Sequence, residues 1–411
     1  MNVRRSAAAL AATAVIGLAT PALAASPSPS PSPSVAIPSG LYGTSDPTYD
    51  GVWRQSLALV AQYRSDVEPA EKAVDWLLGQ QCANGAFAAF RAEPAQDCDA
   101  KVMVDTNSTA AAAQALSLAG DGDRMDDAVK AVTWLKSVQN KDGGWGYTPG
   151  GASDANSTSV VIGALNAVGQ DPGTAVKDGK SPYDALRELA LSCADGGAFA
   201  YQPDKKGKLA ANADATAAAV VGMKGMSMVS AKAADDTELA CATAKASDPG
   251  QSAANGASYL AGEMAKDGHL VSALPGAEDQ PDYGNTADAV VALAVTGGPE
   301  AARKPLAWLE ENSADWAKQS GPAAYAQLIL AAEAAGADPR DFGGANLVSQ
   351  LNATGPEPRT QTGSSDASEE KKDEEKDEDG GVSVWWIIGV GAVAGIGVGF
   401  LISGRNKGQR Q

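Results

Sequence analysis

A repeated opening sequence, placed each time before an Ala-rich apolar stretch, is the feature that most restricts what this chain can fold into. The opening occurs at Asp105-Thr-Asn107-Ser-Thr109, Asp154-Ala-Asn156-Ser-Thr158, Asn212-Ala-Asp214-Ala-Thr216 and Asp282-Tyr-Gly284-Asn-Thr286. An Asp or Asn immediately before an apolar segment is typical of a helix N-cap. The helices that follow are apolar on nearly every face, so each must be buried on most sides.

Amphipathic segments lie between these helices and end in a second motif, a glycine followed two residues later by a large apolar residue. The motif is clearest at Gln139–Trp145 and Gln81–Phe87, with weaker copies at 193–199 and 264–270. The glycine supplies a turn that ends the helix, and the aromatic residue can fold back against that helix.

The two motifs together predict twelve helices in strict alternation. Six are buried, near 50–64, 105–119, 154–168, 212–225, 283–297 and 321–336. Six are amphipathic, near 68–81, 125–140, 181–193, 248–265, 299–318 and 341–353. No terminal repeat resembles a polar cap, which favours a closed barrel over an open solenoid. The predicted fold is therefore all-α, with an inner ring of helices inside an outer ring.

The Gln-x-x-x-Gly-x-Trp pattern of Gln139–Trp145 resembles the repeat of the prenyltransferase and squalene-cyclase (terpenoid cyclase) superfamily. The resemblance covers about residues 46–354 and implies an α/α toroid of six hairpins. The same toroid serves cyclases, protein prenyltransferases, complement thioester domains and the cobalamin carriers intrinsic factor and transcobalamin. Of these branches, the cobalamin carriers are closest to the role predicted below.

The catalytic residues of the enzymatic branches are not matched in this chain. The acidic cluster 121–127 lacks the Asp-x-Asp-Asp spacing of the cyclases, and five Phe give little aromatic lining for a carbocation. Asn107 and Asn156 stand where prenyltransferases place a zinc-binding thiolate, and the single histidine, His269, excludes multi-His metal sites. Gln81-Cys82 has the wrong order for a thioester. The sequence leans away from an enzyme and predicts neither a metal site nor a cofactor.

A parallel set of inner helices would bring their N-termini together at one mouth of the toroid. Polar residues from the helix starts would form a ring there: Asp105, Asn107, Asp154, Asn156, Asn212, Asp214, Asp282 and Asn285. Aromatic residues from the glycine loops would border the ring: Phe87, Phe90, Trp145, Tyr147, Phe199 and Tyr201. Such a rim suits a ligand with polar groups and apolar faces, for example a corrinoid or an oligosaccharide. The alternative is that these residues only cap helices and close turns.

Both ends of the chain are predicted to be targeting segments. Residues 1–24 resemble a secretory signal peptide, and the Ser/Pro-rich residues 25–45 form a spacer ahead of the toroid domain at 46–354. Residues 355–381 form an acidic disordered stalk, 382–403 a membrane-spanning helix, and 404–411 a basic cytoplasmic tail. The predicted location is the cell membrane, with the toroid outside the cell.

Partners are constrained by charge and by the predicted anchor. A formal net charge of −18 excludes nucleic acid as a partner, since phosphate binding needs a basic surface. Gly391, Gly395 and Gly399 have small-x-x-x-small spacing and predict a dimer of membrane helices, although glycine is also tolerated facing lipid. A small-molecule ligand and a surface transporter are the other expected partners.

The four cysteines predict disulfides, because an even number in an exported chain is typical of a disulfide framework. Of three connectivities, we favour Cys82–Cys98, within one long loop, and Cys193–Cys241, which flank one hairpin.

Three functions remain open at this stage. The first is a surface-anchored ligand-binding protein, with a corrinoid as the most specific candidate ligand. The second is an enzyme, either a lyase or glycosidase that uses a carboxylate pair at the mouth, or a degenerate cyclase. The third is an adhesion or interaction module that uses its acidic outer surface.

Overall fold

The structure, a computed structural model, describes residues 36–120, 122–242, 248–272 and 279–359. All of them belong to one compact unit, which spans Val35–Gln411. The predicted signal peptide, membrane helix and cytoplasmic tail, and nearly all of the predicted stalk, lie outside the described residues. In the described part of the chain, no helix has the length and apolar character needed to cross a membrane.

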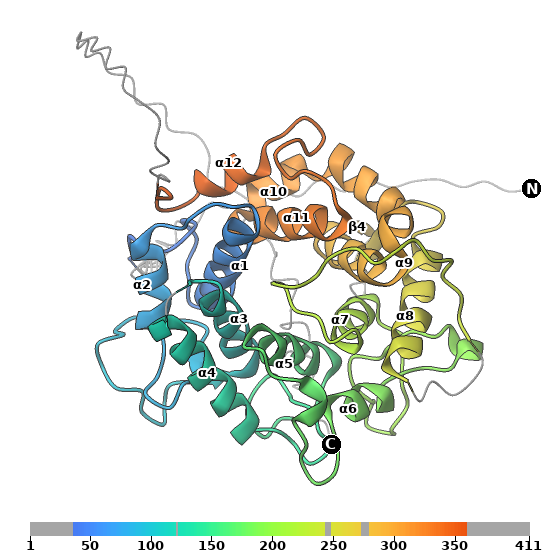
Figure 1. The fold of residues 1–411 in the computed structure, drawn as a ribbon, viewed down its shortest axis with the longest axis horizontal. Helices are drawn as coiled ribbons and strands as arrows, with labels where there is room; N and C mark the ends of the chain where they lie inside the picture. Colours follow the sequence, from blue (N-terminus) through green and yellow to red (C-terminus); the bar gives the residue numbers. More distant parts are fainter. Residues whose placement is uncertain (1–35, 121, 243–247, 273–278, 360–411) are drawn as a thin grey trace, which may run out of the picture. The chain divides into compact units, whose positions relative to one another are not determined.

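Six helices form a closed inner ring, as the sequence predicted (Figure 1). They are α1 (Gly51–Arg64), α3 (Thr106–Ser117), α5 (Ala155–Ala167), α7 (Ala213–Met223), the first half of α9 (Tyr283–Asn312) and α11 (Pro322–Ala335). Each packs against the next, and α11 packs against α1, which closes the ring. Small alanine side chains fill most of the core between these helices. They allow close packing, which explains the low aromatic content.

The outer ring consists of α2 (Glu71–Gly79), α4 (Gly122–Ser137), α6 (Pro182–Glu188), α8 (Pro249–Glu263), the second half of α9, α10 (Ala314–Ser320) and α12 (Leu347–Asn352). Each of α2, α4, α6, α8 and α12 packs on the inner helix next to it in sequence. Helices α6 and α12 fall furthest short of their predicted ranges, 181–193 and 341–353. Helix α6 ends at Glu188, and a 3₁₀ turn, Cys193–Asp195, occupies the predicted last turn.

Helix α9 contains the predicted boundary between an inner and an outer helix. Gly298 has φ of 80° and ψ of −177°, which breaks the helix in a conformation that favours glycine. The outer half then begins at Pro299, and Asp236 Oδ1 accepts a hydrogen bond of 2.9 Å from the Glu300 amide. Asp236 thus caps this helix from a distant part of the chain.

A threonine hydroxyl connects the two sequence motifs in four repeats. Each of these threonines lies four residues after the N-cap and accepts a hydrogen bond from the backbone amide of the glycine-loop residue. The bonds are Phe87–Thr109 (2.9 Å), Trp145–Thr158 (3.1 Å), Phe199–Thr216 (2.9 Å) and Leu270–Thr286 (3.0 Å). We call this contact the threonine clasp. It explains why the two motifs recur together.

Short strand pairs accompany two of the clasps, an element that the sequence did not predict. Strand β1 (Phe87–Ala88) pairs antiparallel with β2 (Val104–Asp105). Strand β3 (Leu270–Ser272) pairs antiparallel with β4 (Gln280–Asp282). Both pairs lead into the N-terminus of an inner helix, so they help to fix where α3 and α9 begin.

Glycines in the second motif allow successive repeats to approach closely. Gly143 has φ of +89°, and a Cβ there would clash with the carbonyl oxygen of Ser181 at the start of α6. Gln139, four residues earlier, donates a hydrogen bond of 2.8 Å to the carbonyl of Ala175. The Gln-x-x-x-Gly spacing therefore joins one outer helix to the segment that precedes the next.

Both predicted disulfides are present. Cys82–Cys98 and Cys193–Cys241 join Cα atoms 5.6 and 5.7 Å apart. The packed domain also extends beyond its predicted bounds of 46 and 354. Tyr42, within the predicted spacer, is fully buried, and Arg359, within the predicted stalk, forms an ion pair of 2.9 Å with Glu71. These contacts hold the two ends of the described segment on the ring.

Candidate functional site: the central cavity

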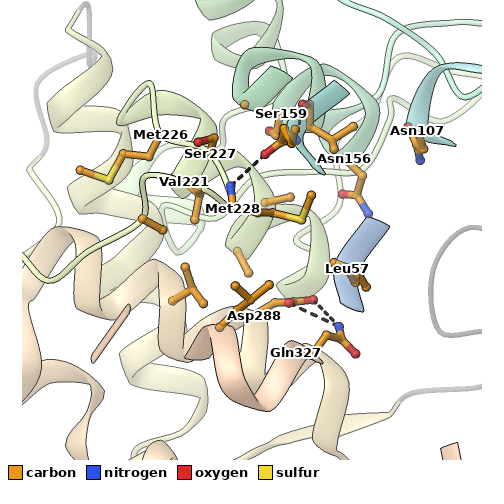
Figure 2. Close-up of a pocket in the computed structure, with 18 of the residues that line it drawn as sticks. Leu57, Asn107, Asn156, Ser159, Val221, Met226, Ser227, Met228, Asp288 and Gln327 are labelled. Atoms are coloured by element: carbon orange, nitrogen blue, oxygen red, sulfur yellow. Dashed lines mark hydrogen bonds between the residues drawn. The ribbon is translucent and has the colours of Figure 1, made fainter. Parts of the chain in front are cut away.

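A cavity of about 170 Å³ lies within the inner ring (Figure 2). Its polar wall residues come from five of the six inner helices and from the loop after α7: Asn107, Gln114, Asn156, Ser159, Asp214, Ser227, Asp288 and Gln327. Its apolar wall residues include Trp53, Leu57, Val221, Met226, Met228 and Leu330. The cavity therefore combines a mainly apolar wall with a small number of polar groups.

Helix periodicity decides which residues reach the cavity. In α7 the wall residues are Asp214, Ala217, Ala218 and Val221, a spacing of three or four that keeps them on one face of the helix. Asn212, the N-cap, lies off that face and accepts a hydrogen bond of 2.8 Å from the Ala215 amide. The residue two positions after an N-cap thus points inward, while the cap itself turns back onto its own helix.

The segment after α7 lines the end of the cavity away from the helix N-termini. The Met228 amide donates a 2.9 Å hydrogen bond to Gln114 Oε1, and Arg64 donates a 2.7 Å bond to the carbonyl of Val229. The Ala234 amide donates to the carbonyl of Ala294 near the end of the inner half of α9. We call residues 226–237 the crossing segment. Its contacts with three inner helices fix the shape of the cavity at this end.

Two carboxylates face the cavity. Asp214 accepts a hydrogen bond of 2.7 Å from the side-chain amide of Asn156. Asp288 accepts two long bonds, of 3.4 and 3.5 Å, from the amide of Gln327 (Figure 2). No Lys, Arg or His of the described chain is among the residues that line the cavity, so neither carboxylate has a cationic partner in the wall.

The surroundings of both carboxyl groups oppose ionisation. Burial raises the pKa of Asp214 to about 6, with a further contribution from the charge of Asp282, while the Asn156 hydrogen bond opposes the rise. Burial, together with the negative charges of Asp214 and Asp282, raises the pKa of Asp288 to about 7. A carboxylic acid with such a pKa can give up or accept a proton near neutral pH.

Several polar atoms of the wall have no partner within the protein. The side-chain oxygens of Asn107, Asn156 and Ser159 are buried without a hydrogen bond. Asn107 and Ser159 are only 8% and 7% exposed. Buried polar atoms without a partner cost free energy, and such atoms in a cavity wall are normally satisfied by water or by a ligand.

The predicted ring of polar residues separates into two groups in the structure. Asn107, Asn156 and Asp214 line the cavity. Asp105, Asp154, Asn212 and Asp282 are N-caps whose side chains accept bonds from backbone amides, and Asn285 donates a 2.8 Å bond to Asp282. Burial raises the pKa of both Asp105 and Asp154 to about 6, an effect that their hydrogen bonds oppose.

None of the six predicted aromatic residues lines the cavity. Phe87, Trp145 and Phe199 are buried in the threonine clasps, and the Trp145 indole donates a 2.7 Å bond to the carbonyl of Leu135. Phe90 stacks on Trp76 of the outer ring, with ring centroids 6.5 Å apart. Tyr147 is 42% exposed, Tyr201 is half-buried, and burial raises the pKa of each to about 12. Phe87, Trp145 and Phe199 therefore close the repeats, whereas Tyr147 and Tyr201 lie beside the inner-helix N-termini, where their carbonyls accept hydrogen bonds from the Thr106 and Ala155 amides.

Sequence reasoning missed Gln114, Ser159, Asp288 and Gln327. One signal was present, because Asp288 and Gln327 are polar residues inside helices that are otherwise apolar on nearly every face. Among the described residues, no group of three or more His, Cys, Asp or Glu side chains could hold a metal ion.

Comparisons with known proteins match parts of this chain to one family and to individual proteins. Residues 52–234 match the family described as squalene-hopene cyclase C-terminal domain. A segment of 78 residues, 19% of this chain, is 37% identical to a drimenyl diphosphate synthase from Streptantibioticus cattleyicolor and covers 13% of it. A segment of 139 residues, 31% of this chain, is 30% identical to a squalene–hopene cyclase from Alicyclobacillus acidocaldarius and covers 22% of it. The chain thus matches less than a quarter of either relative's length.

Among solved structures, an ent-copalyl diphosphate synthase from Streptomyces platensis superimposes with a TM-score of 0.45 at 13% identity. The superposition covers 70% of this chain and 50% of that one.

Proposed function

Since this chain belongs to the prenyltransferase and squalene-cyclase superfamily, we propose that it is an exported ligand-binding protein whose site is the cavity of the inner ring. The observation that carries this proposal is the set of unpartnered oxygens on Asn107, Asn156 and Ser159 in the cavity wall. Stability alone gives no reason to bury these atoms unsatisfied, whereas a bound ligand can satisfy them.

The size of the cavity limits the ligand. A volume of about 170 Å³ is below the roughly 300–1,000 Å³ of pockets for drug-sized molecules. A small organic molecule, or one end of a longer one, fits this space. A corrinoid or an oligosaccharide is far larger and would have to bind mainly at the rim, so the cavity gives more support to a smaller ligand.

Export is part of the proposal and is supported by the disulfides. Cys82–Cys98 and Cys193–Cys241 account for all four cysteines, and such bridges persist in oxidising compartments. We propose that residues 382–403 anchor the chain in the membrane with the toroid outside, where it could pass its ligand to a transporter. Protease treatment of intact cells tests this arrangement, since an exposed toroid should be digested while the cytoplasmic tail is protected.

A second candidate function is acid catalysis, favoured by the raised pKa values of two carboxyl groups in one cavity. Asp288, with a pKa of about 7, could donate its proton to an alkene while the Asp214 carboxylate stabilises the resulting cation. Loss of a proton from the carbon next to the cation to the Asp288 carboxylate would then give an isomerised alkene and restore the acid. Turnover of short isoprenoids in D₂O tests this function. Deuterium incorporation that disappears in Asp288→Asn would support it.

A thermal-shift screen of small amines, polyols and short isoprenoid alcohols tests ligand binding. Ala218 lines the cavity, so Ala218→Phe should fill it and abolish any stabilisation by a ligand. Ala307, exposed on the outer half of α9, provides the matched control Ala307→Phe, which should behave like the unaltered chain. If ligands stabilise the Ala218→Phe variant as well as the unaltered chain, the cavity is not the site.

A further inference from the structure

The cavity wall offers many more hydrogen-bond acceptors than donors. The carboxylates of Asp214 and Asp288 accept hydrogen bonds when ionised and cannot donate them. The Asn156 amide nitrogen faces Asp214, because a carboxylate oxygen needs a donor, and this orientation leaves the Asn156 oxygen free. Asn107, only 8% exposed, adds a second unpartnered amide oxygen.

The donors in the same wall are largely used within the protein. The Gln327 amide donates to Asp288, and Gln114 donates to the carbonyl of Val160 while its oxygen accepts from Met228. The Ser159 hydroxyl and the amide nitrogen of Asn107 are the donors of the described wall that remain without a partner, against four carboxylate oxygens and two amide oxygens that can accept. A ligand that satisfies this wall must therefore bring N–H or O–H groups of its own.

The charge of the two carboxylates favours a cation over a neutral molecule among ligands that bring hydrogen-bond donors. Two carboxylates that repel each other face a cavity with no cationic side chain in its described wall. A neutral polyol would leave that repulsion in place, whereas an ammonium group would relieve it. Trp53, Met226 and Met228 also line the cavity, and aromatic faces and polarisable sulfur atoms suit the alkyl part of an organic cation.

We propose that the ligand of the central cavity is a small primary alkylammonium compound, held by charge-assisted hydrogen bonds to Asp214 and Asp288. The amide oxygens of Asn107 and Asn156 accept its remaining N–H groups. This inference rests on the proposed function, since it names the chemical class of the ligand for the same cavity. Bound ammonium also favours the ionised form of Asp288, whose pKa is otherwise raised to about 7 by burial.

Calorimetric titration of the purified full chain at pH 8 with three probes of similar size tests the proposal. n-Butylammonium, 1-butanol and butyrate share an alkyl chain and differ in the charge of the head group. We expect n-butylammonium to bind at least about tenfold more tightly than 1-butanol, because charge-assisted hydrogen bonds are about twice as strong as neutral ones. Butyrate should not bind.

Variants separate the two carboxylates from general effects of charge. Asp214→Asn and Asp288→Asn should each reduce the preference for n-butylammonium over 1-butanol by about tenfold, as expected when one charged partner is lost. Asp315→Asn, at an exposed position in the first turn of α10, removes the same charge outside the cavity and should leave the preference unchanged. Melting curves of each variant establish that it is folded.

The outcomes distinguish this inference from the function on which it rests. If 1-butanol binds as tightly as n-butylammonium, and Ala218→Phe abolishes both, the cavity is a ligand site but the cationic class is wrong. If n-butylammonium binds equally well to Ala218→Phe, it binds elsewhere and the inference fails. If none of the probes binds, the inference is overturned, while the proposed binding function is decided by the thermal-shift screen and the Ala218→Phe variant.

Discussion

Replacing Asp288 by Asn is expected to stabilise the protein at pH 8 and to have a much smaller effect at pH 5. The carboxyl group has a pKa of about 7 in the folded protein, raised from 3.8 mainly by burial. A raised pKa means that the folded state prefers the protonated acid. The stability gained from that preference is complete below about pH 4 and is lost as the pH rises through about 7.

The size of this stability difference follows from the part of the pH range between pH 5 and the folded-state pKa of about 7. Two pH units at about 1.4 kcal/mol each give close to 3 kcal/mol, and we expect about 2 kcal/mol because the half-buried side chain borders a cavity. For a chain of this size, 2 kcal/mol corresponds to a melting-temperature shift of about 4 °C. Asparagine does not titrate, so the Asp288→Asn variant should not lose this stability as the pH rises.

Differential scanning calorimetry from pH 5 to pH 8 measures the effect on both proteins. Asp105, Asp154 and Asp214, whose pKa values are raised to about 6, add pH dependence to both curves, so only the difference between the curves reports Asp288. Asp315→Asn, exposed in α10, is the control and should parallel the unaltered chain. Parallel curves for Asp288→Asn and the unaltered chain would refute the assignment of this pH dependence to Asp288.

Three further predictions concern the scaffold and use urea unfolding as the measurement. Thr158→Val removes a clasp while keeping the side-chain shape, and leaving the Trp145 amide unsatisfied should cost about 1–3 kcal/mol; an unchanged midpoint would show that the clasp does not stabilise the repeat. Gly143→Ala should cost more than 1 kcal/mol, because the left-handed conformation and the contact with the Ser181 carbonyl both disfavour a Cβ; a neutral effect would contradict the close approach. Converting Cys193 and Cys241 to Ala should destabilise by about 4 kcal/mol, against about 3 kcal/mol for Cys82 and Cys98, because the first pair closes the longer loop; the reverse order would contradict the loop-entropy explanation.

The helices could be predicted from the sequence because their boundaries depend on local chemistry. Asp105 and Asp154 begin helices as caps in any context, and Gly298 followed by Pro299 breaks a helix wherever it occurs. Closure of the ring followed from burial, since helices apolar on nearly every face need neighbours on every side. These rules need no knowledge of which residues meet across the fold.

The cavity wall could be predicted only in part, because it depends on contacts between residues that are far apart in the sequence. A helix that is apolar all round gives no indication of which face points to the centre, so Asp288 and Gln327 could not be placed beside Asp214. The crossing segment has no helical period, and its position depends on long-range bonds such as that between Gln114 and Met228. Phe87, Trp145 and Phe199 do not reach the cavity, because the threonine clasps hold their backbone amides.

A crystal structure of the full chain with the compound that gives the largest thermal shift would show where the ligand binds. We expect ligand density in the central cavity, with polar ligand atoms within hydrogen-bond distance of the Asn107 and Asn156 side-chain oxygens and of Asp214 or Asp288. Density at the rim or on the outer ring, with only water in the cavity, would show that the central cavity is not the binding site.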